Sequence, residues 1–242
     1  MKCLGIDFGW KSQPSGLCCL ELHDGQLQLL DLERKDSIAD ILNWIDRTVK
    51  PEEPAIIAVD APTLIPNATG SRLPDQLSHK YFGKYHAGCY PANQNLPFSD
   101  RTISFGLELE SGGFAHAPTI EPKKPGRYQI EVFPHPAIVN LFGLERILKY
   151  KKGRLSERRL ELIKLYNYIV KVLPTLQPSL VSPSLPADVP YTGAGLKNLE
   201  DQLDSLICAY VAAYWWFWGE QRNLVLGDVS TGYIVIPQRI SD

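Results

Sequence analysis

The 242-residue sequence has no apolar run long enough to cross a membrane and no export signal. Its most apolar stretch, residues 206–218, is shorter than the roughly 18 to 20 residues that a membrane-spanning helix needs. Met1 leads directly into a strand-like segment, without the basic and apolar regions of a secretory signal. We therefore expect no membrane contact and a cytoplasmic location.

Cysteine is scarce, and its spacing is not that of a metal or redox site. The five cysteines are odd in number, and no two have the Cys-x-x-Cys spacing of zinc and redox motifs. Closely spaced sets of histidine and cysteine, which zinc sites require, are missing as well. The sequence therefore favours reduced thiols at Cys3, Cys18, Cys19, Cys89 and Cys208.

Neither sign of charge is in excess. Lysine and arginine number 25, aspartate and glutamate 27, and the formal net charge is -2. This balance argues against a strongly basic coat for nucleic acid but leaves room for a local basic groove. A hydrophobic share of 44% suffices for one large core, and we see neither repeats nor a flexible linker. We therefore expect a single domain over residues 1–242.

The first half of the chain predicts three strands, a helix and a buried strand. Residues 2–7, 16–21 and 26–31 read as antiparallel strands, with a His-Asp-Gly turn before the third. Apolar residues at 3-4 spacing predict a helix over 38–49. Residues 55–60 are almost wholly apolar, as in a central strand buried on both faces.

A long excursion rich in Pro, Gly and Asn then separates this strand from the next. It covers residues 61–126, with a weak helical pattern over 75–82, and the closing strand is 127–133. Helices are expected over 155–173 and 197–218, and a hairpin at the end of the chain. This order predicts an α/β fold with a mixed sheet, helices on both faces and an insertion after the central strand.

Acidic residues stand where apolar elements would otherwise continue. Asp7 and Asp60 end strands whose carboxyl ends should meet, and Glu131 lies within a strand. Asp201 and Asp204 are spaced i, i+3 on a helix, where the helix dipole near its amino end would favour acids in any case. Each acid alone could simply cap a turn or pair with a cation.

Together, these acids suggest a site for a divalent cation. Clustered carboxylates on buried elements need cations, hydrogen bonds or protons to offset their repulsion and desolvation. Mg²⁺ or Mn²⁺ prefers oxygen ligands, and such ions can activate water at a phosphodiester. The hypothesis is a metal site formed by Asp7, Asp60, Glu131, Asp201 and Asp204.

The ordered set of motifs resembles the DUF429 family, which is described as a predicted ribonuclease H-like nuclease. The resemblance runs over nearly the whole chain and includes the closing GYIVIP segment. Its motifs are GIDFGW (5–10), AVDAP (58–62), GSRLPD (70–75), YPAN (90–93), IEVFPHP (130–136) and DQLDSL (201–206).

That resemblance implies a ribonuclease H-like sheet and a metal-dependent phosphodiester hydrolase. Asp7 would be the first-strand carboxylate and Asp60 the central-strand one. Asp204, with Asp201 nearby, would be the helix carboxylate of a retroviral-integrase-type fold, and Glu131 would complete the polar end. The implied catalytic residues are Asp7, Asp60, Glu131 and Asp204.

Several other residues are candidates for binding substrate. Arg72 could hold two phosphate oxygens through its planar guanidinium, with a solvated loop as the alternative. His135 could transfer a proton or orient a carboxylate, or could simply be part of a rigid turn between two prolines.

The chain also has one dense basic run and one aromatic cluster. The basic run could grip a nucleic-acid backbone through residues such as Lys151 and Arg154, or form a solvated helix end. It contains Lys149, Lys151, Lys152, Arg154, Arg158 and Arg159. The aromatic cluster 214–218 fits a buried core or a homodimer contact.

Two functions compete with the nuclease hypothesis. An actin-like or sugar-kinase-like nucleotide binder is suggested by the GIDFG segment, which also resembles the first phosphate loop of that superfamily. The chain is short for two such domains and shows no second loop of this kind. The other competitor is a non-catalytic nucleic-acid-binding module in which the acids are structural. Binding of ATP and of divalent cations separates the three.

Overall fold

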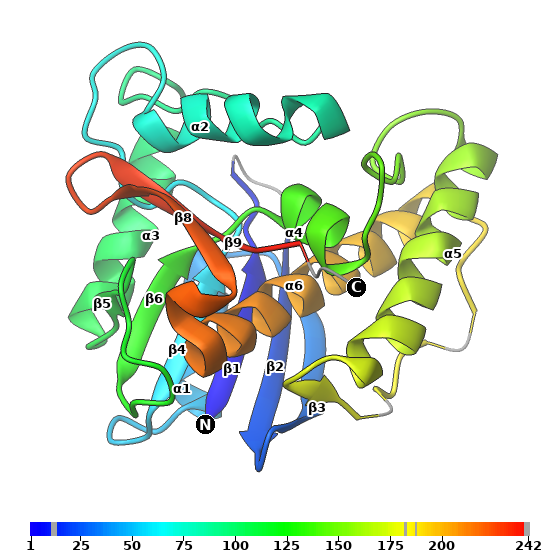
Figure 1. The fold of residues 1–242 in the computed structure, drawn as a ribbon, viewed down its shortest axis with the longest axis horizontal. Helices are drawn as coiled ribbons and strands as arrows, with labels where there is room; N and C mark the ends of the chain where they lie inside the picture. The colour runs from blue at the N-terminus through cyan, green and yellow to red at the C-terminus, as the bar shows by residue number, and fades with distance from the viewer. Residues whose placement is uncertain (11–13, 182, 187, 240–242) are drawn as a thin grey trace.

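The computed structural model describes residues 1–10, 14–181, 183–186 and 188–239. One seven-stranded sheet forms its centre (Figure 1). Its strands are β1 (Lys2–Asp7), β2 (Ser15–His23), β3 (Gln26–Lys35), β4 (Ala55–Val59), β5 (Ala115–His116), β6 (Arg127–Glu131) and β7 (Ser179–Leu180). Their order across the sheet is β5-β6-β4-β1-β2-β3-β7.

The strand directions define the fold class. β1, β2 and β3 form the predicted antiparallel meander, and β4 and β6 extend it in parallel on the other side of β1. β4 is buried at every position, as its continuous apolar sequence predicted. An antiparallel meander continued by parallel strands in this order is a ribonuclease H-like sheet, and the predicted fold class is confirmed.

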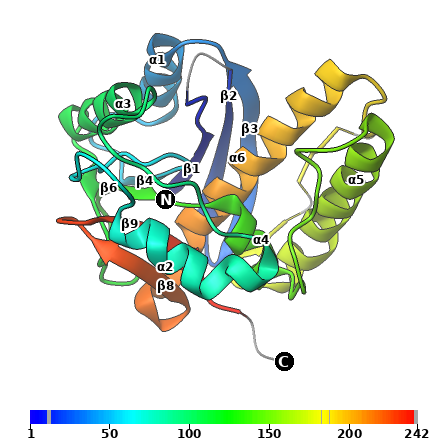
Figure 2. The same cartoon turned by 90° about the horizontal axis from the view of Figure 1, so that it is seen from above.

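Helices cover both faces of the sheet (Figure 2). The helices are α1 (Ile38–Thr48), α2 (Leu73–Phe82), α3 (Ser99–Ser111), α4 (Pro134–Leu141), α5 (Leu155–Val172) and α6 (Gly193–Trp218). Side chains of α1 and α3 pack on one face, while α4, α5 and α6 share a larger core on the other. Short 3₁₀ helices are η1 (Gly83–Tyr85), η2 (Leu173–Thr175) and η3 (Gly219–Gln221).

Local sequence explains α1 well. Its N-cap Ser37 accepts a hydrogen bond from the Asp40 N–H at 3.1 Å, which satisfies one of the free amides of the first turn. Ile41, Trp44 and Ile45 are buried, so the 3-4 spacing of apolar residues marks the face that packs on the sheet.

The long helix α6 is part of the core. The cluster 214–218 contributes Tyr214, Trp215 and Phe217 to the interior, and Cys208 is fully buried. Within the described ranges, no helix is both long enough and apolar enough to span a bilayer.

The excursion over residues 61–126 has more structure than the sequence predicted. The weak helical pattern corresponds to α2, but α3 was not predicted, because Thr102, Gly106 and other small or polar residues form part of its buried face. The prolines after β6 were interpreted as a turn, and this was wrong. Pro134 and Pro136 lie in the first turn of α4, where proline needs no amide partner.

The predicted terminal hairpin is formed by β8 (Asn223–Asp228) and β9 (Gly232–Pro237). It meets the main sheet through a parallel bridge between Val132 and Val235. Figure 2 shows α2 next to the hairpin strand β8 and to one side of β1 and β4, and α2 contacts both strands of the hairpin. Residues of the insertion and of β9 line the same cavity as the strand ends that carry Asp7 and Asp60.

Candidate active site

Asp7 and Asp60 lie side by side where two parallel strands end. Asp7 is the last residue of β1, and Asp60 directly follows β4. Ile6 pairs with Val59, and the Asp60 N–H donates to the Ile6 carbonyl oxygen at 2.9 Å. The structure thus brings the two acids together at one edge of the sheet, as the strand pattern predicted.

Two glycines allow α6 to bring further acids to Asp7. A Cβ atom at Gly5 would lie 2.0 Å from the Ser205 carbonyl oxygen, and one at Gly16 would lie 2.0 Å from that of Asp201. Only residues without a side chain permit a helix backbone this close to a sheet. Gly16 is the cross-strand partner of Asp7, so this close approach sets α6 beside the end of β1.

The two acids of α6 are not explained by the helix dipole. The helix begins at Gly193, earlier than predicted, and Thr192 caps it by accepting from the Gly195 N–H at 3.1 Å. Asp201 and Asp204 therefore lie well beyond the first turn, where the dipole has little effect. Both are buried, so their charges need direct partners.

Asp204 finds its partners in the segment that precedes α5. Tyr150 Oη donates to Asp204 Oδ1 at 2.7 Å, and Lys151 Nζ lies 2.8 Å from Asp204 Oδ2. Burial alone would lower the pKa of Lys151, but the carboxylates of Asp204, Asp7 and Asp60 raise it well above its ordinary value. Lys151, a predicted substrate-binding residue, lines the cavity described below, and its ammonium group pairs with Asp204.

Asp201 is held by two cations from different elements. Arg34 Nη2 of β3 lies 2.8 Å from Asp201 Oδ2, and Lys197 Nζ lies 2.7 Å from Asp201 Oδ1. Lys197 also donates to Glu200 at 2.7 Å. Asp201 is therefore balanced within the protein, and Asp204 is the helix acid that shares a cation with Asp7 and Asp60.

The pKa values of the two acids at the strand ends, Asp7 and Asp60, are strongly raised. Desolvation by the surrounding protein raises the pKa of Asp60 to about 7, with Lys151 opposing this shift and Asp204 adding to it. Desolvation likewise raises the pKa of Asp7 well above its usual value, opposed by Lys151 and reinforced by the neighbouring aspartates. Such shifts are typical of buried carboxylates that lie close to one another.

Arg72 and Glu131 form a buried network that the sequence did not predict. Arg72 Nη1 and Nη2 donate to the two Glu131 carboxylate oxygens at 2.7 and 2.6 Å. The remaining N–H groups of Arg72 donate to Asp75 and to the Leu64 carbonyl oxygen. All five donors are used, so Arg72 has none left for phosphate.

Glu131 is correspondingly less available as a metal ligand, because both of its oxygens accept from Arg72. Burial raises the pKa of Glu131 to about 7, although Arg72 opposes the shift. The Arg72–Glu131 pair ties the insertion to β6. Within the insertion, Asp75 Oδ2 also accepts from the Ala92 N–H at 2.8 Å. The network thus holds one wall of the site in place.

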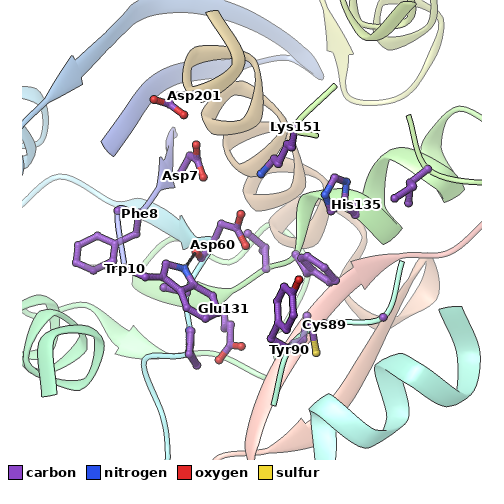
Figure 3. A pocket seen from close by; sticks show the side chains of 18 of the residues that line it. Asp7, Phe8, Trp10, Asp60, Cys89, Tyr90, Glu131, His135, Lys151 and Asp201 are labelled. Atoms are coloured by element: carbon purple, nitrogen blue, oxygen red, sulfur yellow. Dashed lines mark hydrogen bonds between the residues drawn. The ribbon is translucent and has the colours of Figure 1, made fainter. Parts of the chain in front are cut away.

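These groups surround a cavity of about 800 Å³ at the edge of the sheet (Figure 3). Acidic lining residues are Asp7, Asp60, Glu131 and Asp201, and basic ones are Arg72, Lys149, Lys151, Lys152 and Lys197. In the view of Figure 3, the labelled side chains run from Asp201 through Asp7 and Asp60 to Tyr90 and Cys89. Four of the five predicted acids therefore share a cavity with residues of the insertion, and Asp204 lies behind its wall.

His135 lines the same cavity from the first turn of α4. Its Nδ1 atom is buried and has no hydrogen-bond partner in the described chain. Burial, together with the nearby ammonium of Lys151, lowers the pKa of His135 to about 4, although Asp204 opposes the shift. The imidazole is therefore neutral at pH 7, with a free polar atom.

Only part of the basic run is available to a ligand. Arg158 donates to the Tyr150 carbonyl oxygen at 3.0 Å and to Glu200 at 3.3 Å, and Arg159 donates to the Val189 carbonyl oxygen. These two arginines support the fold. The exposed members of the run are Lys149, Lys152 and Arg154.

The donor set fits a hard divalent cation through its chemistry. Asp7, Asp60 and Asp204 come from different elements and lie near the ammonium group of Lys151, and burial raises the pKa values of Asp7 and Asp60. In the described part of the chain, however, no three His, Cys, Asp or Glu side chains stand close enough together to hold an ion. Lys151 is the cation found among these acids.

Residues that sequence reasoning missed come mainly from loops. Tyr150 and Lys197 reach the site from distant segments, and no local pattern marks them. Tyr90 belongs to the YPAN motif, but the sequence assigned it no role. Arg72 and Asp75 do have a signal, because their i, i+3 spacing at a predicted helix start is typical of a capping pair.

The fold and the site together define a ribonuclease H-like domain with a cluster of aspartates at the ends of β1 and β4. The chain belongs to the family described as "Protein of unknown function (DUF429)", which matches residues 5–231. None of the curated proteins compared with the chain matches it.

Two solved structures share a similar chain path. One is T. thermophilus RuvC in complex with a Holliday junction substrate, with 12% identity and a TM-score of 0.36, covering 88% of this chain and 97% of that one. The other is a Fowlpox virus resolvase with Holliday junction DNA, with 10% identity and a TM-score of 0.34, covering 88% and 95%. The fold assignment rests on the strand order described above.

Proposed function

We propose that this protein is a divalent-metal-dependent nuclease that hydrolyses phosphodiester bonds of nucleic acid. The observation that carries the proposal is that Asp7 and Asp60, at the ends of neighbouring strands, line one cavity, with Asp204 of α6 buried beside them and paired with Lys151.

Asp7, Asp60 and Asp204 would hold the ion, with Asp201 adjacent. When bound, Mg²⁺ or Mn²⁺ would supply activation of water and neutralisation of charge at the phosphate. Lys151 balances Asp204 and lies close enough to Asp7 and Asp60 to alter their pKa values. The exposed ammonium groups of Lys149 and Lys152 are placed at the cavity to contact the phosphate backbone.

Comparison of the wild-type protein with Asp7→Asn tests this function. We expect the wild type to cleave at least one of single-stranded DNA, RNA, a hybrid or a branched duplex with Mg²⁺ or Mn²⁺, and to lose cleavage in EDTA. Asp7→Asn should lower the rate at least 100-fold, because it removes one negative ligand. Asp46→Asn, which changes an exposed aspartate of α1, is the matched control. Cleavage that survives in Asp7→Asn would refute the proposal.

A second candidate function is a non-catalytic nucleic-acid-binding module. The ion pair between Lys151 and Asp204 favours it, since an internal cation already offsets one acid. Calorimetric titration with Mn²⁺ distinguishes the two functions. Heat of binding that disappears in Asp7→Asn supports the nuclease, whereas nucleic-acid binding without any metal binding supports the module.

The nucleotide-binding alternative is tested by titration with ATP. Of the two glycines in the GIDFG segment, Gly5 lies inside β1 against the backbone of α6, with no room for a phosphate on that face, so helix packing explains it. Gly9 lines the cavity. Absence of ATP binding in calorimetry would exclude this alternative.

A further inference from the structure

The cavity has an apolar half that a metal site alone does not explain. Beside the acids, its wall is formed by Val132, Phe133, Ile147, Leu148 and Ile234. These residues come from the end of β6, the segment before α5 and the hairpin strand β9, so the surface is assembled from distant parts of the chain. Phosphate groups are recognised by charge and hydrogen bonds, and they gain nothing from apolar walls.

The volume of about 800 Å³ lies in the range of sites that enclose small organic groups. A nucleobase combines flat apolar faces with a polar edge. Faces of that kind need an apolar or aromatic wall, and the edge needs a hydrogen-bonding group that has no other partner.

Both kinds of group are present next to the acids. His135 offers a buried Nδ1 atom without a protein partner within the described ranges, and its ring meets that of Phe133 edge-on at 5.7 Å between centroids. Tyr90 lines the cavity from the insertion with 71% of its surface exposed. An aromatic side chain this exposed has a face free for stacking.

The rim beside Tyr90 carries the charge that a nucleotide strand would require. Lys152 Nζ donates to Tyr90 Oη at 3.1 Å, so the insertion and the basic run touch at the mouth of the cavity. Lys149 lies in the same wall. A phosphate near these lysines and a base in the apolar half would belong to one nucleotide next to the acids.

We propose that the apolar half of the cavity receives an unpaired nucleobase, stacked on Tyr90 and hydrogen-bonded to His135, so that the substrate is single-stranded or carries unpaired nucleotides. This inference rests on the proposed nuclease function and names its substrate class. In a continuous duplex, each base face is covered by its neighbours, and a base would have to leave the stack before entering the cavity.

Binding measurements in the Asp7→Asn background test the inference without cleavage. The probes are a fluorescein-labelled 12-nucleotide single strand, the blunt duplex of the same sequence, and unlabelled dAMP as competitor. We expect the single strand to bind at least 10-fold more tightly than the duplex, and dAMP to compete only weakly because it lacks the neighbouring phosphates.

Variants of Tyr90 test whether a base stacks on its ring. Tyr90→Ala should weaken single-strand binding about 10-fold, in line with the loss of one stacked base, and Tyr90→Phe should restore most of it. Tyr191→Ala is the matched control, because Tyr191 is 76% exposed and does not line the cavity. Both tyrosines are exposed, so the variants should keep the unfolding curve of the parent.

Three results would overturn the inference. Equal binding of duplex and single strand, with no effect of Tyr90→Ala, would leave the nuclease function intact but remove the base site. Competition by dAMP as strong as that of the oligonucleotide would assign the cavity to a small nucleotide. Absence of binding to any nucleic acid, together with absence of cleavage by the wild type, would remove the proposed function and this inference with it.

Discussion

At the scale of single residues, the Arg72 network shows how much of the cavity depends on a buried charge. The side chains of Arg72, Asp75 and Glu131 are exposed by only 2%, 1% and 5%. Removing one partner from such a group leaves an uncompensated charge inside the protein, which costs more than the pair itself contributes. A single substitution in this network should therefore lower the free energy of unfolding strongly.

We expect Arg72→Met to lower the free energy of unfolding by about 3 to 5 kcal/mol. It removes the side-chain hydrogen bonds of Arg72 to Leu64, Asp75 and Glu131 and leaves Glu131 buried without its cation. Adding Glu131→Gln to this variant should recover part of the loss, because no carboxylate then remains at position 131. Urea unfolding measures both variants. A loss below about 1 kcal/mol in Arg72→Met would show that the network is not a structural support.

Because His116 is buried, we expect it to make the protein less stable as the pH falls. Burial lowers the pKa of His116 to about 4, whereas an unfolded histidine titrates near 6.5. The unfolded chain therefore takes up a proton between these values while the folded protein does not, so acidification in this range favours unfolding.

Comparison with His116→Gln isolates this contribution from that of the acids. Between pH 7 and pH 5, we expect the wild type to lose about 1 kcal/mol more stability than the variant, a figure that allows for screening at the partly exposed ring. Urea unfolding at both pH values gives the difference. Equal losses of stability between pH 7 and pH 5 in the wild type and His116→Gln would mean that His116 keeps an ordinary pKa.

Single residues were also where sequence reasoning was least complete. Asp7 and Asp60 were placed correctly because parallel strands end at a common edge, which follows from local patterns alone. The inward direction of Lys151 and the pairing of Arg72 with Glu131 depend on segments far apart in the chain. No periodicity encodes such contacts.

At the scale of elements, the contact between α6 and the sheet sets the geometry of the site. The helix crosses β1 and β2 at Gly5 and Gly16, where any side chain would meet the helix backbone. Gly83 offers the opposite environment, since nothing lies within 4 Å of a Cβ placed there and its backbone is helical. The two kinds of glycine should respond differently to the same substitution.

We expect Gly5→Ala to destabilise the protein by at least about 3 kcal/mol, because it overfills a backbone contact that cannot move aside. Gly83→Ala should be neutral or stabilise by up to about 1 kcal/mol, since alanine fits that conformation. Thermal and urea unfolding measure the stability of both variants. If Gly5→Ala and Gly83→Ala were equally stable, the close approach of α6 to β1 would be contradicted.

Elements with a strong apolar period were predicted, and the others were not. The meander, α1, the buried strand and the terminal hairpin all have clear local patterns. α3 was missed because its buried face includes Ser99, Thr102 and Gly106, which carry little hydrophobic signal. α4 was missed because two prolines were taken for a turn although they occupy a position that suits a helix start.

At the scale of the whole molecule, charge is distributed so that attraction to nucleic acid is local. The formal net charge is -2, and the exposed cations of the basic run are Lys149, Lys152 and Arg154. Few phosphates can then be neutralised at once. Binding should depend only modestly on salt, in contrast to proteins with a basic coat.

We expect the logarithm of the association constant for single-stranded DNA to fall with the logarithm of salt concentration with a slope of about -2. Lys152→Met should make this slope shallower by about one unit, because one phosphate contact is lost. Lys124→Met is the control, since Lys124 is exposed and pairs with Glu121 outside the cavity. A slope that is the same in all three proteins would remove Lys152 from the interface.

The glycine contacts of α6 also bear on how this protein can change over evolutionary time. Gly5 and Asp7 are two residues apart on one strand, so they share a face, and that face is the one against which α6 rests. A mutation at Gly5 would therefore displace the acids of α6 without touching any of them. We therefore expect the Gly-x-Asp spacing to tolerate change only as one unit, because a side chain at Gly5 would move the helix that faces the carboxylate.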